Sequence, residues 1–449
     1  MILVSAGYGS AQSLADKDWH LTFQTGRLGP VETVLVFKET EGGLTAHSLS
    51  GARSVIAEFP RVKERKANIG EHLLAFSLKK TADGYAGELT APWAGEKVSL
   101  ILTESGFKGK ISGGLLGGAF SGVPATPAAD KPLRDYRAAV EAFLQTVETK
   151  VFDPRALRGA DWKIFARNMK KIGAAGRDDL DLLFGFHFAY ESKPFSHLTL
   201  ARANVPAPQL MIQFDSYRVG GTPAVIEFDG DVAVLTVKTM IGVDTVEQIE
   251  AAFQEIGKRS PKALIIDLRG NGGGAFAIKP LIEHVIDRPL DAGYFITHRW
   301  NIKNDRLPSA EELSAVEPWQ GFSLKAWWEN IQSEGIIRLE FKPAQPNFDG
   351  PVFVLIDSRS ASATEMAADA LSTVNSVTLV GETTEGQVLS QSPFDTSDGF
   401  QAFIPVADYY STANGRLEGV GVKPQVEAAS KEALEVAKKL AQKAIEAGG

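Results

Sequence analysis

The stretch Ala263-Leu-Ile-Ile-Asp-Leu-Arg-Gly-Asn-Gly-Gly-Gly274 decides the fold class of the domain that contains it. Its first six residues are apolar except for Asp267, which is typical of a strand buried on both faces. Residues 231–237 form an earlier apolar run, and residues 246–256 repeat apolar side chains with the period of a helix. Strand, helix and strand in this order predict a βαβ unit, so we expect one α/β domain over residues 196–428.

The four glycines that end this stretch, at positions 270, 272, 273 and 274, predict a loop that stabilises an anion. They are too closely spaced for a dinucleotide-binding turn, and no acidic residue follows at the end of a second strand. A tight turn that needs positive φ would explain one or two glycines but not four. Consecutive glycines expose backbone N–H groups, and two such groups can form an oxyanion hole.

A further apolar strand, residues 351–356, leads into a serine-rich turn and then into a helix, which is indicated by small or apolar residues at positions 363, 366, 367, 370 and 371. Ser362 lies in the first turn of this helix, where the helix dipole and free N–H groups favour a developing negative charge. Ser358 and Ser360 are equally candidates for the helix cap. This segment by itself therefore does not identify a nucleophile.

Taken together, three motifs resemble the tail-specific, or C-terminal-processing, serine peptidases, whose superfamily also holds tricorn protease and interphotoreceptor retinoid-binding protein. The motifs are Asp267-Leu-Arg-Gly-Asn-Gly-Gly-Gly274, Ser360-Ala-Ser-Ala-Thr-Glu365 and Gly381-Glu-Thr-Thr-Glu-Gly386. The resemblance covers residues 134–427 and implies a crotonase-like α/β domain, a ββα spiral, that hydrolyses peptide bonds through an acyl-enzyme. It implies Ser362 as the nucleophile. It also implies an oxyanion hole formed by the N–H of Ala363 and by one glycine of the Gly272–Gly274 run, with Gly272 and Gly273 as the named candidates.

The residue after Gly386 departs from the bacterial and chloroplast branch of this family. Those peptidases use a Ser–Lys dyad, and their lysine follows the last glycine of the G-x-x-T-x-G segment. Here that position is Gln387, whose amide cannot accept a proton from a hydroxyl at neutral pH. No lysine lies between Ser362 and Lys423. A Ser–Lys dyad at its usual place is therefore excluded.

The tricorn branch uses a histidine instead, and this chain has a Ser196-His197 pair at the predicted boundary between helices and α/β domain. The resemblance implies that His197 takes the proton of the nucleophile, while Ser196 and Glu418 fix the tautomer of its ring. An imidazole has an ordinary pKa near 6.5 and needs such an orienting group. The other histidines considered are His187, predicted to be structural, and two backup candidates for the base, His284 and His298.

Composition narrows the possible functions. The net charge of -8 gives no basic footprint for a nucleic acid, and no apolar run reaches the roughly 18 residues that a membrane helix requires. There is no cysteine and no H-E-x-x-H motif, so we expect no disulfide, no thiolate nucleophile, no metal site and no cofactor. The expected partner is a peptide or unfolded protein, and the sequence gives no oligomeric state.

The chain is expected to be multidomain α+β, with an antiparallel β barrel or sandwich followed by a helical cap and the α/β domain. The predicted ranges are a leader at 1–18, the β module at 19–105, a Gly/Pro/Ala linker at 106–131, the cap at 132–195, the α/β domain at 196–428 and a C-terminal helix at 429–449. We interpret the leader as the remnant of an export signal, which predicts a periplasmic or secreted protein; a cytoplasmic protein is the alternative.

Two features concern substrate selection. Too few residues separate His197 from Asp231 for a peptide-binding PDZ domain, so selection is left to the cap, the β module or an insertion at residues 300–345. That insertion carries Trp300, Trp319, Trp327 and Trp328, which could line a cleft. The rival functions are a non-catalytic protein on the same fold that binds peptides or hydrophobic ligands, and an acyl-thioester enzyme without a serine nucleophile.

Overall fold

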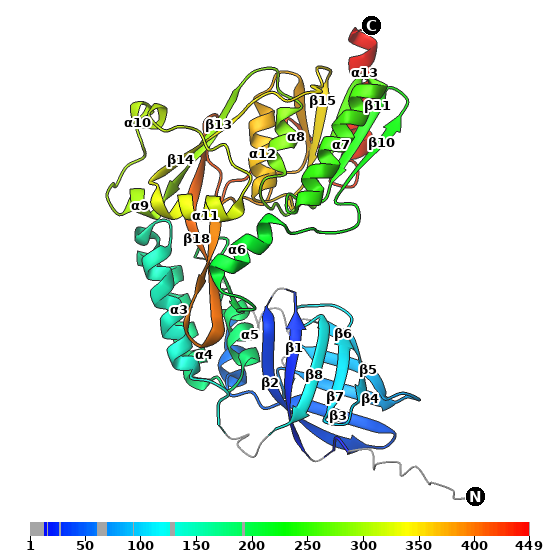
Figure 1. Ribbon diagram of the computed structural model, residues 1–449, viewed down its shortest axis with the longest axis vertical. Coiled ribbons are helices and arrows are strands. Elements are labelled where there is room, and N and C mark those ends of the chain that lie inside the picture. Colours follow the sequence, from blue (N-terminus) through cyan, green and yellow to red (C-terminus); the bar gives the residue numbers. More distant parts are fainter. Residues whose placement is uncertain are drawn as a thin grey trace, which may run out of the picture.

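The computed structural model describes residues 13–15, 17–26, 28–60, 70–92, 94–125, 131–190 and 194–448. A β barrel, a group of helices and a larger α/β part follow one another along the chain (Figure 1). Most of the predicted leader, residues 1–12 and 16, lies outside the described residues. None of the helices that the structure describes is both long and apolar enough to cross a bilayer.

The N-terminal part is a closed antiparallel barrel, as one of the two predicted alternatives required. Strand β1 (Asp18–Thr25) pairs with β2 (Gly29–Thr40) on one side and with β8 (Gly118–Pro124) on the other, which closes the sheet. The strands between them are β3 (Gly43–Ser48), β4 (Ala75–Lys80), β5 (Tyr85–Ala91), β6 (Ala94–Leu102) and β7 (Phe107–Ile111), and a short helix α1 (Arg53–Ala57) follows β3. Alternate residues of β1 point inward, so Trp19, Leu21 and Phe23 are fully buried.

The predicted linker at residues 106–131 is wrong, because this segment supplies the barrel strands β7 and β8. Its glycines misled the prediction because they serve packing inside strands. A Cβ on Gly109 would lie 2.3 Å from the ring of Phe120, and a Cβ on Gly122 would lie 2.1 Å from the ring of Phe107. Glycine in a strand interior can mark such a close approach rather than a loop.

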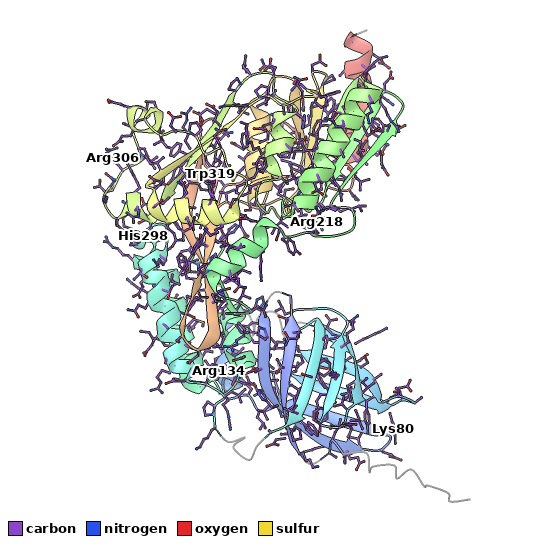
Figure 2. All side chains as sticks on the ribbon, viewed as in Figure 1. Lys80, Arg134, Arg218, His298, Arg306 and Trp319 are labelled. Atoms are coloured by element: carbon purple, nitrogen blue, oxygen red, sulfur yellow. The ribbon has the colours of Figure 1, made fainter. Side chains whose placement is uncertain are left out.

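The described residues of the predicted cap, 132–190 and 194–195, are mainly helical, with α3 (Tyr136–Lys150), the short 3-10 helix η1 (Pro154–Arg158), α4 (Ala160–Ala175) and α5 (Asp179–Ala189). They lie between the barrel and the α/β part, alongside the lower half of β18 (Figure 1). Asp179 joins them to the barrel: its carboxylate accepts from Tyr136 Oη at 2.9 Å and from the Glu32 N–H at 3.0 Å. Arg134, which lies at this junction in Figure 2, pairs with Asp179 at 3.2 Å.

A six-stranded sheet forms the core of the α/β part, in the order β10 (Ala224–Asp229), β11 (Val232–Val237), β12 (Ala263–Asp267), β15 (Val352–Ile356), β16 (Val377–Gly381), β20 (Val426–Glu427). All neighbours are parallel except β10 and β11, and α7 (Val243–Arg259) supplies the predicted βαβ crossover. Strand residues alternate between two apolar clusters: Ile265 packs with the C-terminal helix α13 (Ala433–Gly448), whereas Leu264 and Ile266 pack in the main core with Phe253 of α7. Both faces of the sheet are therefore covered.

A second sheet lies beside the first, in the order β14 (Ile336–Phe341), β13 (Leu290–Thr297), β18 (Phe400–Ser411), β17 (Ser390–Asp395), with β9 (Thr199–Arg202) and β19 (Gly415–Arg416) also paired to β18. The remaining helices are α6 (Ala207–Asp215), α8 (Ile278–Glu283), α9 (His298–Asn301), α10 (Ala310–Ser314), α11 (Leu324–Ser333), α12 (Ala363–Ser372) and the 3-10 turn η3 (Ser397–Gly399). The site described below lies between the two sheets, where β12, α12 and the start of β17 meet.

Candidate active site

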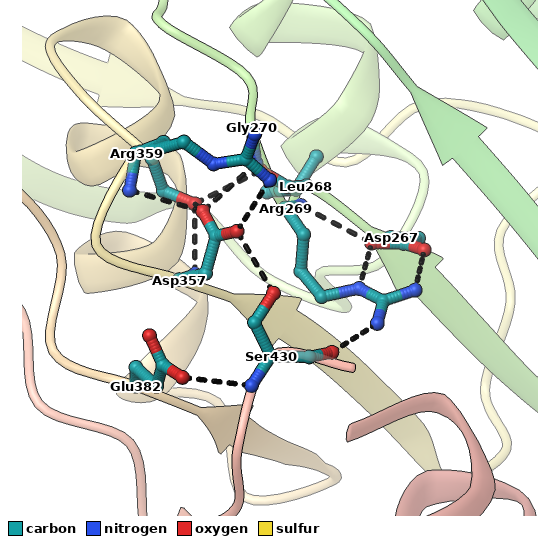
Figure 3. A network of polar contacts seen from close by, with 9 residues as sticks. Asp267, Leu268, Arg269, Gly270, Asp357, Arg359, Glu382 and Ser430 are labelled. Atoms are coloured by element: carbon teal, nitrogen blue, oxygen red, sulfur yellow. Dashed lines mark hydrogen bonds and ion pairs between the residues drawn. The ribbon is translucent and has the colours of Figure 1, made fainter. Parts of the chain in front are cut away.

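A polar network fixes the glycine loop after β12 (Figure 3). The guanidinium of Arg269 is held by Asp267, through Nε at 2.9 Å and Nη2 at 2.6 Å. The carboxylate of Asp357, which follows β15, accepts from the Gly270 N–H and from Ser430 Oγ, both at 2.9 Å. The ends of two neighbouring strands and the segment before α13 are thereby joined, and the loop leaves the sheet in one defined direction.

The loop itself is anchored by Asn271, a fully buried residue that the sequence analysis did not single out. Its Nδ2 donates to the Val237 carbonyl at 2.9 Å, and its Oδ1 accepts from the Gly273 N–H at 3.0 Å. Gly273 has φ of 92°, and a Cβ there would lie 2.6 Å from the carbonyl oxygen of Ala361 and 2.7 Å from Cβ of Ser362. Glycine is therefore required for the loop to approach the serine this closely.

Ser362 is the N-cap residue of α12 and has φ of 59° and ψ of −125°, outside the regions that non-glycine residues normally occupy. Within the described part of the chain only three other non-glycine residues have positive φ, and one of them is His197 at 60°. Such strain persists where the surrounding structure imposes it, and it gathers at functional sites. Both residues that were predicted to exchange the proton are thus held in unusual backbone conformations.

Glu365, one turn into α12, holds the strained serine in place. It is fully buried, and its carboxylate accepts from the Ser362 N–H at 3.0 Å, from Thr384 Oγ1 at 2.5 Å, and from the N–H groups of Gly386 and Gln387 at 2.7 and 2.8 Å. Burial raises the pKa of Glu365, and these hydrogen bonds oppose the rise. In the sequence this residue is visible only as part of a motif, whereas in the structure it links the serine to the 384–387 loop.

Ser360 also has a structural position rather than the cap position considered for it. Its Oγ donates to the Leu268 carbonyl at 2.9 Å and accepts from the Asp357 N–H at 3.0 Å. The serine turn is therefore fastened directly to the glycine loop.

Ser196, His197 and Glu418 are brought together although 222 residues separate the first from the last. Ser196 Oγ lies 2.7 Å from Nδ1 of His197 and donates to Oε2 of Glu418 at 3.1 Å. The carboxylate of Glu418 also accepts from the N–H of Ser196 at 3.2 Å and from the N–H of Val388 at 2.8 Å. Val388 directly follows the 384–387 loop that Glu365 anchors. The same stretch of chain is therefore bonded to both glutamates.

These contacts fix the tautomer of His197. A hydroxyl has one proton, and the proton of Ser196 is directed to a carboxylate that can only accept. Ser196 Oγ must then accept from Nδ1–H of the ring, which leaves Nε2 of the neutral imidazole unprotonated and able to accept a proton. Burial lowers the pKa of His197, which favours the neutral ring, and the charge of Glu418 opposes this shift.

Aromatic side chains from the helices position the base. Phe195 is buried and stacks on Trp162 of α4 with centroids 5.9 Å apart and an interplanar angle of 23°. The Tyr190 hydroxyl donates to the Phe195 carbonyl. The residue before the Ser196-His197 pair is thus held from two sides.

His197 and Ser362 line the same cavity, which has a volume of about 410 Å³ and which we call the Ser362 cavity. Gly272, Gly273, Gly274 and Ala363 also line it, as do Trp319, Trp327 and Trp328 of the insertion. Trp300 does not; it lines a separate pocket, and its Nε1 donates to the Arg306 carbonyl. In the described part of the chain no hydrogen bond joins Ser362 Oγ to His197.

The proposed oxyanion donors differ in availability. Among the described residues, no acceptor is bonded to the N–H of Gly272 or of Ala363, and both residues face the Ser362 cavity. The N–H of Gly273 is already used by Asn271 Oδ1, so in this conformation Gly273 is not a free donor. Within the expected run Gly272–Gly274, Gly272 therefore remains a candidate donor and Gly273 does not.

The backup histidines lie elsewhere. His284 is fully buried, with Nδ1 2.7 Å from the Pro346 carbonyl and Nε2 2.9 Å from Glu250, and Nδ1 of His298 lies 2.6 Å from the Val151 carbonyl. Neither lines the Ser362 cavity. Gln387 bonds Glu385 with its side chain and Glu365 with its backbone.

Comparisons with known proteins give one family and several distant relatives. Residues 231–428 match the family model described as Peptidase family S41. The carboxy-terminal processing protease CtpA of Bacillus subtilis is 26% identical over 231 residues, 51% of this chain and 42% of that protein. The carboxyl-terminal-processing protease of a Picosynechococcus species is 34% identical over 177 residues, 39% of this chain and 34% of that protein. The chain spans less than half the length of these two relatives.

Among solved structures, the crystal structure of the tricorn protease aligns over 92% of this chain and 46% of that one, with a TM-score of 0.44 and 12% identity. A similarity at this level carries no further argument.

Proposed function

We propose that residues 231–428, which match the Peptidase family S41 model, form the catalytic domain of a serine peptidase that works through an acyl-enzyme at Ser362. The observation that carries the proposal is the hydrogen-bonded set of Ser196, His197 and Glu418, because it leaves Nε2 free to accept a proton on a ring that lines the same cavity as Ser362. A serine hydroxyl becomes a nucleophile when an adjacent oriented base takes its proton.

In the first half of the reaction, Ser362 Oγ bonds to the carbonyl carbon of the substrate while its proton passes to Nε2 of His197. The carbonyl oxygen becomes an oxyanion, for which the N–H groups of Ala363 and Gly272 are the available donors. Removing one such donor in other enzymes lowers kcat by about 10²–10³. The imidazolium then protonates the leaving amine, the C–N bond breaks, and an acyl-enzyme remains.

In the second half, His197 accepts a proton from water, and the resulting hydroxide attacks the acyl carbon. The bond to Ser362 Oγ breaks, the serine regains its proton from the ring, and a carboxylic acid leaves. Glu418 acts as a positioning residue through Ser196, because its negative charge stabilises the imidazolium that forms in both halves.

The same proposal includes the finer features that the resemblance implied: a crotonase-like α/β domain, a cap formed by residues 132–195, the tricorn-type base, and a peptide or unfolded-protein substrate in the periplasm or outside the cell. The curated relatives are named as carboxyl-terminal processing proteases, which supports a protein substrate.

A fluorophosphonate probe tests the proposal, because it labels only a serine that a base has activated. We expect a single labelled peptide that contains Ser362, and no label in Ser362→Ala. His197→Ala should lower the labelling rate by at least about 10³-fold, by analogy with other serine enzymes that lose their base. His187→Ala, which changes an exposed histidine on α5, and Gln387→Ala should label like the unmodified protein.

Labelling that survives in His197→Ala would refute His197 as the base. An unlabelled wild-type protein would refute the peptidase and favour the non-catalytic binding protein on the same fold. An acyl-thioester enzyme, which has no nucleophilic serine, would also remain unlabelled and would be recognised by thioesterase or hydratase activity.

A further inference from the structure

The Ser362 cavity is lined mainly by aromatic and apolar side chains. Trp327 is one of the lining residues and lies edge to face with Phe295 at 5.2 Å and 75° and with Trp319 at 5.5 Å and 78°. Trp328, Leu339, Phe341 and Met366 complete the apolar wall. Trp319 lies close to α11 in Figure 2, so the wall comes largely from the insertion that the sequence analysis singled out. Aromatic pairs prefer this geometry, and another ring entering it would gain edge-to-face contacts.

Hydrogen bonds join two helices, α6 and α11, that both contribute side chains to the lining of the cavity. Asp215, the last residue of α6, accepts from Ser323 Oγ at 2.7 Å and from the N–H of Leu324, at the start of α11. Met211 of α6 and Leu324 both line the cavity. The pocket is therefore formed before any ligand enters, which reduces the entropy that binding must overcome.

The charged groups at the cavity are already paired. The ammonium of Lys279 lies 3.8 Å from Glu283 and 4.6 Å from the ring centroid of Phe322. The carboxylate of Glu340 lies 3.5 Å from Arg338. A charged side chain that entered the cavity would thus be taken out of water without a free counter-charge, which is unfavourable.

The volume of the cavity also favours a large apolar side chain as its ligand. A cavity of about 410 Å³ beside the nucleophile is far larger than an alanine side chain needs, whereas a phenyl or phenol ring would contact several of its walls at once. Full burial of a large apolar side chain contributes about 1.5–3 kcal/mol, which corresponds to roughly 10- to 150-fold in binding.

We propose that the Ser362 cavity is a specificity pocket for a large aromatic side chain, carried by the substrate residue whose carbonyl Ser362 attacks, and that Trp327 is its main specificity-determining residue. This inference rests on the proposed function. The carbonyl carbon under attack is bonded to the Cα of that residue, and the oxyanion donors Gly272 and Ala363 line the same cavity. The side chain next to that carbonyl is therefore the one that reaches the aromatic wall.

The test uses internally quenched peptides that differ at one position only, with Phe, Tyr, Leu, Ala, Lys or Asp before the cleaved bond. We expect kcat/KM for Phe and Tyr to exceed that for Ala by roughly 10- to 100-fold, and Lys and Asp to be poorer than Ala. Trp327→Ala should lower kcat/KM for the Phe peptide about tenfold and leave the Ala peptide within about twofold, because only the larger side chain reaches Trp327.

The chain offers a matched control. Trp300→Ala removes the same side chain from the same insertion but outside the cavity, so it should leave the ratio of Phe to Ala unchanged. Leu339→Trp fills the cavity from a partly exposed position and should lower the Phe peptide selectively, which keeps the test decisive if Trp327→Ala does not fold.

Equal cleavage of Phe and Ala peptides, or a preference that follows the residue after the cleaved bond, would overturn the inference. So would a Phe preference that survives in both Trp327→Ala and Leu339→Trp. Fluorophosphonate labelling of Ser362 separates these failures from failure of the proposed function. If Ser362 is labelled but kcat/KM does not depend on the side chain before the cleaved bond, only the specificity pocket is refuted. If Ser362 is not labelled, the proposed peptidase activity is refuted.

Discussion

Two regions of the site each contain a glutamate that accepts several hydrogen bonds, but the two glutamates have different roles. We call the surroundings of Ser362 and Glu365 the nucleophile corner, and Ser196, His197 and Glu418 the base corner. In the nucleophile corner, the carboxylate of Glu365 accepts from three backbone N–H groups and from Thr384. Its hydrogen bonds therefore fix the backbone around the serine and the 384–387 loop. In the base corner, one of the donors to Glu418 is the hydroxyl of Ser196, which also bonds the ring of His197. The donors, and not the carboxylates, therefore decide which of the two glutamates is structural and which acts on the base.

The largest effect should come from Ser362 and His197, the two residues that line the cavity and are proposed to exchange the proton. His197→Ala and Ser362→Ala should each lower kcat on a peptide substrate by about 10⁴–10⁶, and the double variant should lose no more, because the two act as a unit. Initial rates with a quenched peptide measure this. Additive losses would show that the two corners do not work together.

Glu365→Gln should reveal the structural character of the nucleophile corner. The amide NH₂ of glutamine would face N–H and O–H donors, so buried donors lose their acceptor at a cost of about 2–4 kcal/mol in the free energy of unfolding. Urea denaturation measures it. Glu385→Gln, an exposed neighbour in the same loop, is the matched control and should change stability by no more than about 0.5 kcal/mol. Equal effects in the two variants would contradict the clamp.

The two corners also differ in how far sequence could predict them. The nucleophile corner follows from local patterns, since an apolar strand, a serine turn and helical spacing all lie within residues 351–371. The positions of Asn271 and Ser360 in it could not be predicted, because their polar groups bond atoms 34 and 92 residues away. The base corner has no local signal for its assembly, and only the family resemblance placed Glu418 beside Ser196.

In the barrel, too, contacts between residues distant in sequence limited the prediction, and here they caused strands to be missed. Segments rich in β-forming residues and separated by turn residues predict its early strands, but the segment of β7 and β8 resembles a linker, because glycine is a loop signal when only neighbours in sequence are considered. Gly109 and Gly122 are glycines because rings of Phe120 and Phe107 occupy the space a side chain would need. That reason lies across the sheet and is invisible along the chain.

Ser196→Ala should sharpen the difference between the glutamates, because it removes the hydroxyl that connects Glu418 to the ring and leaves the backbone N–H bond to Glu418 in place. We expect kcat to fall about 10- to 100-fold with KM nearly unchanged, which is the size of effect that orienting partners usually have. Ser196→Thr retains the hydroxyl and should recover most of the rate. A loss that Thr does not recover, or a change confined to KM, would indicate a merely structural serine.

The smallest effect is a shift in pH dependence. His197 acts as base only when neutral, so kcat/KM should rise with pH through a value below 6.5, because burial lowers the pKa of His197, and should level off above it. The negative charge of Glu418 opposes that lowering. In Glu418→Gln, the pH range over which the remaining kcat/KM rises (the acid limb) should therefore move to still lower pH, by less than about one unit because the charge is screened. The folded protein binds fewer protons at His197 than the unfolded chain, so this residue also makes the fold less stable as the pH falls below 6.5. Glu365→Gln leaves the charge that acts on the ring in place and should not move the limb. A limb that moves upward in Glu418→Gln, or that moves equally in both variants, would mean that the two glutamates are not divided between base and clamp.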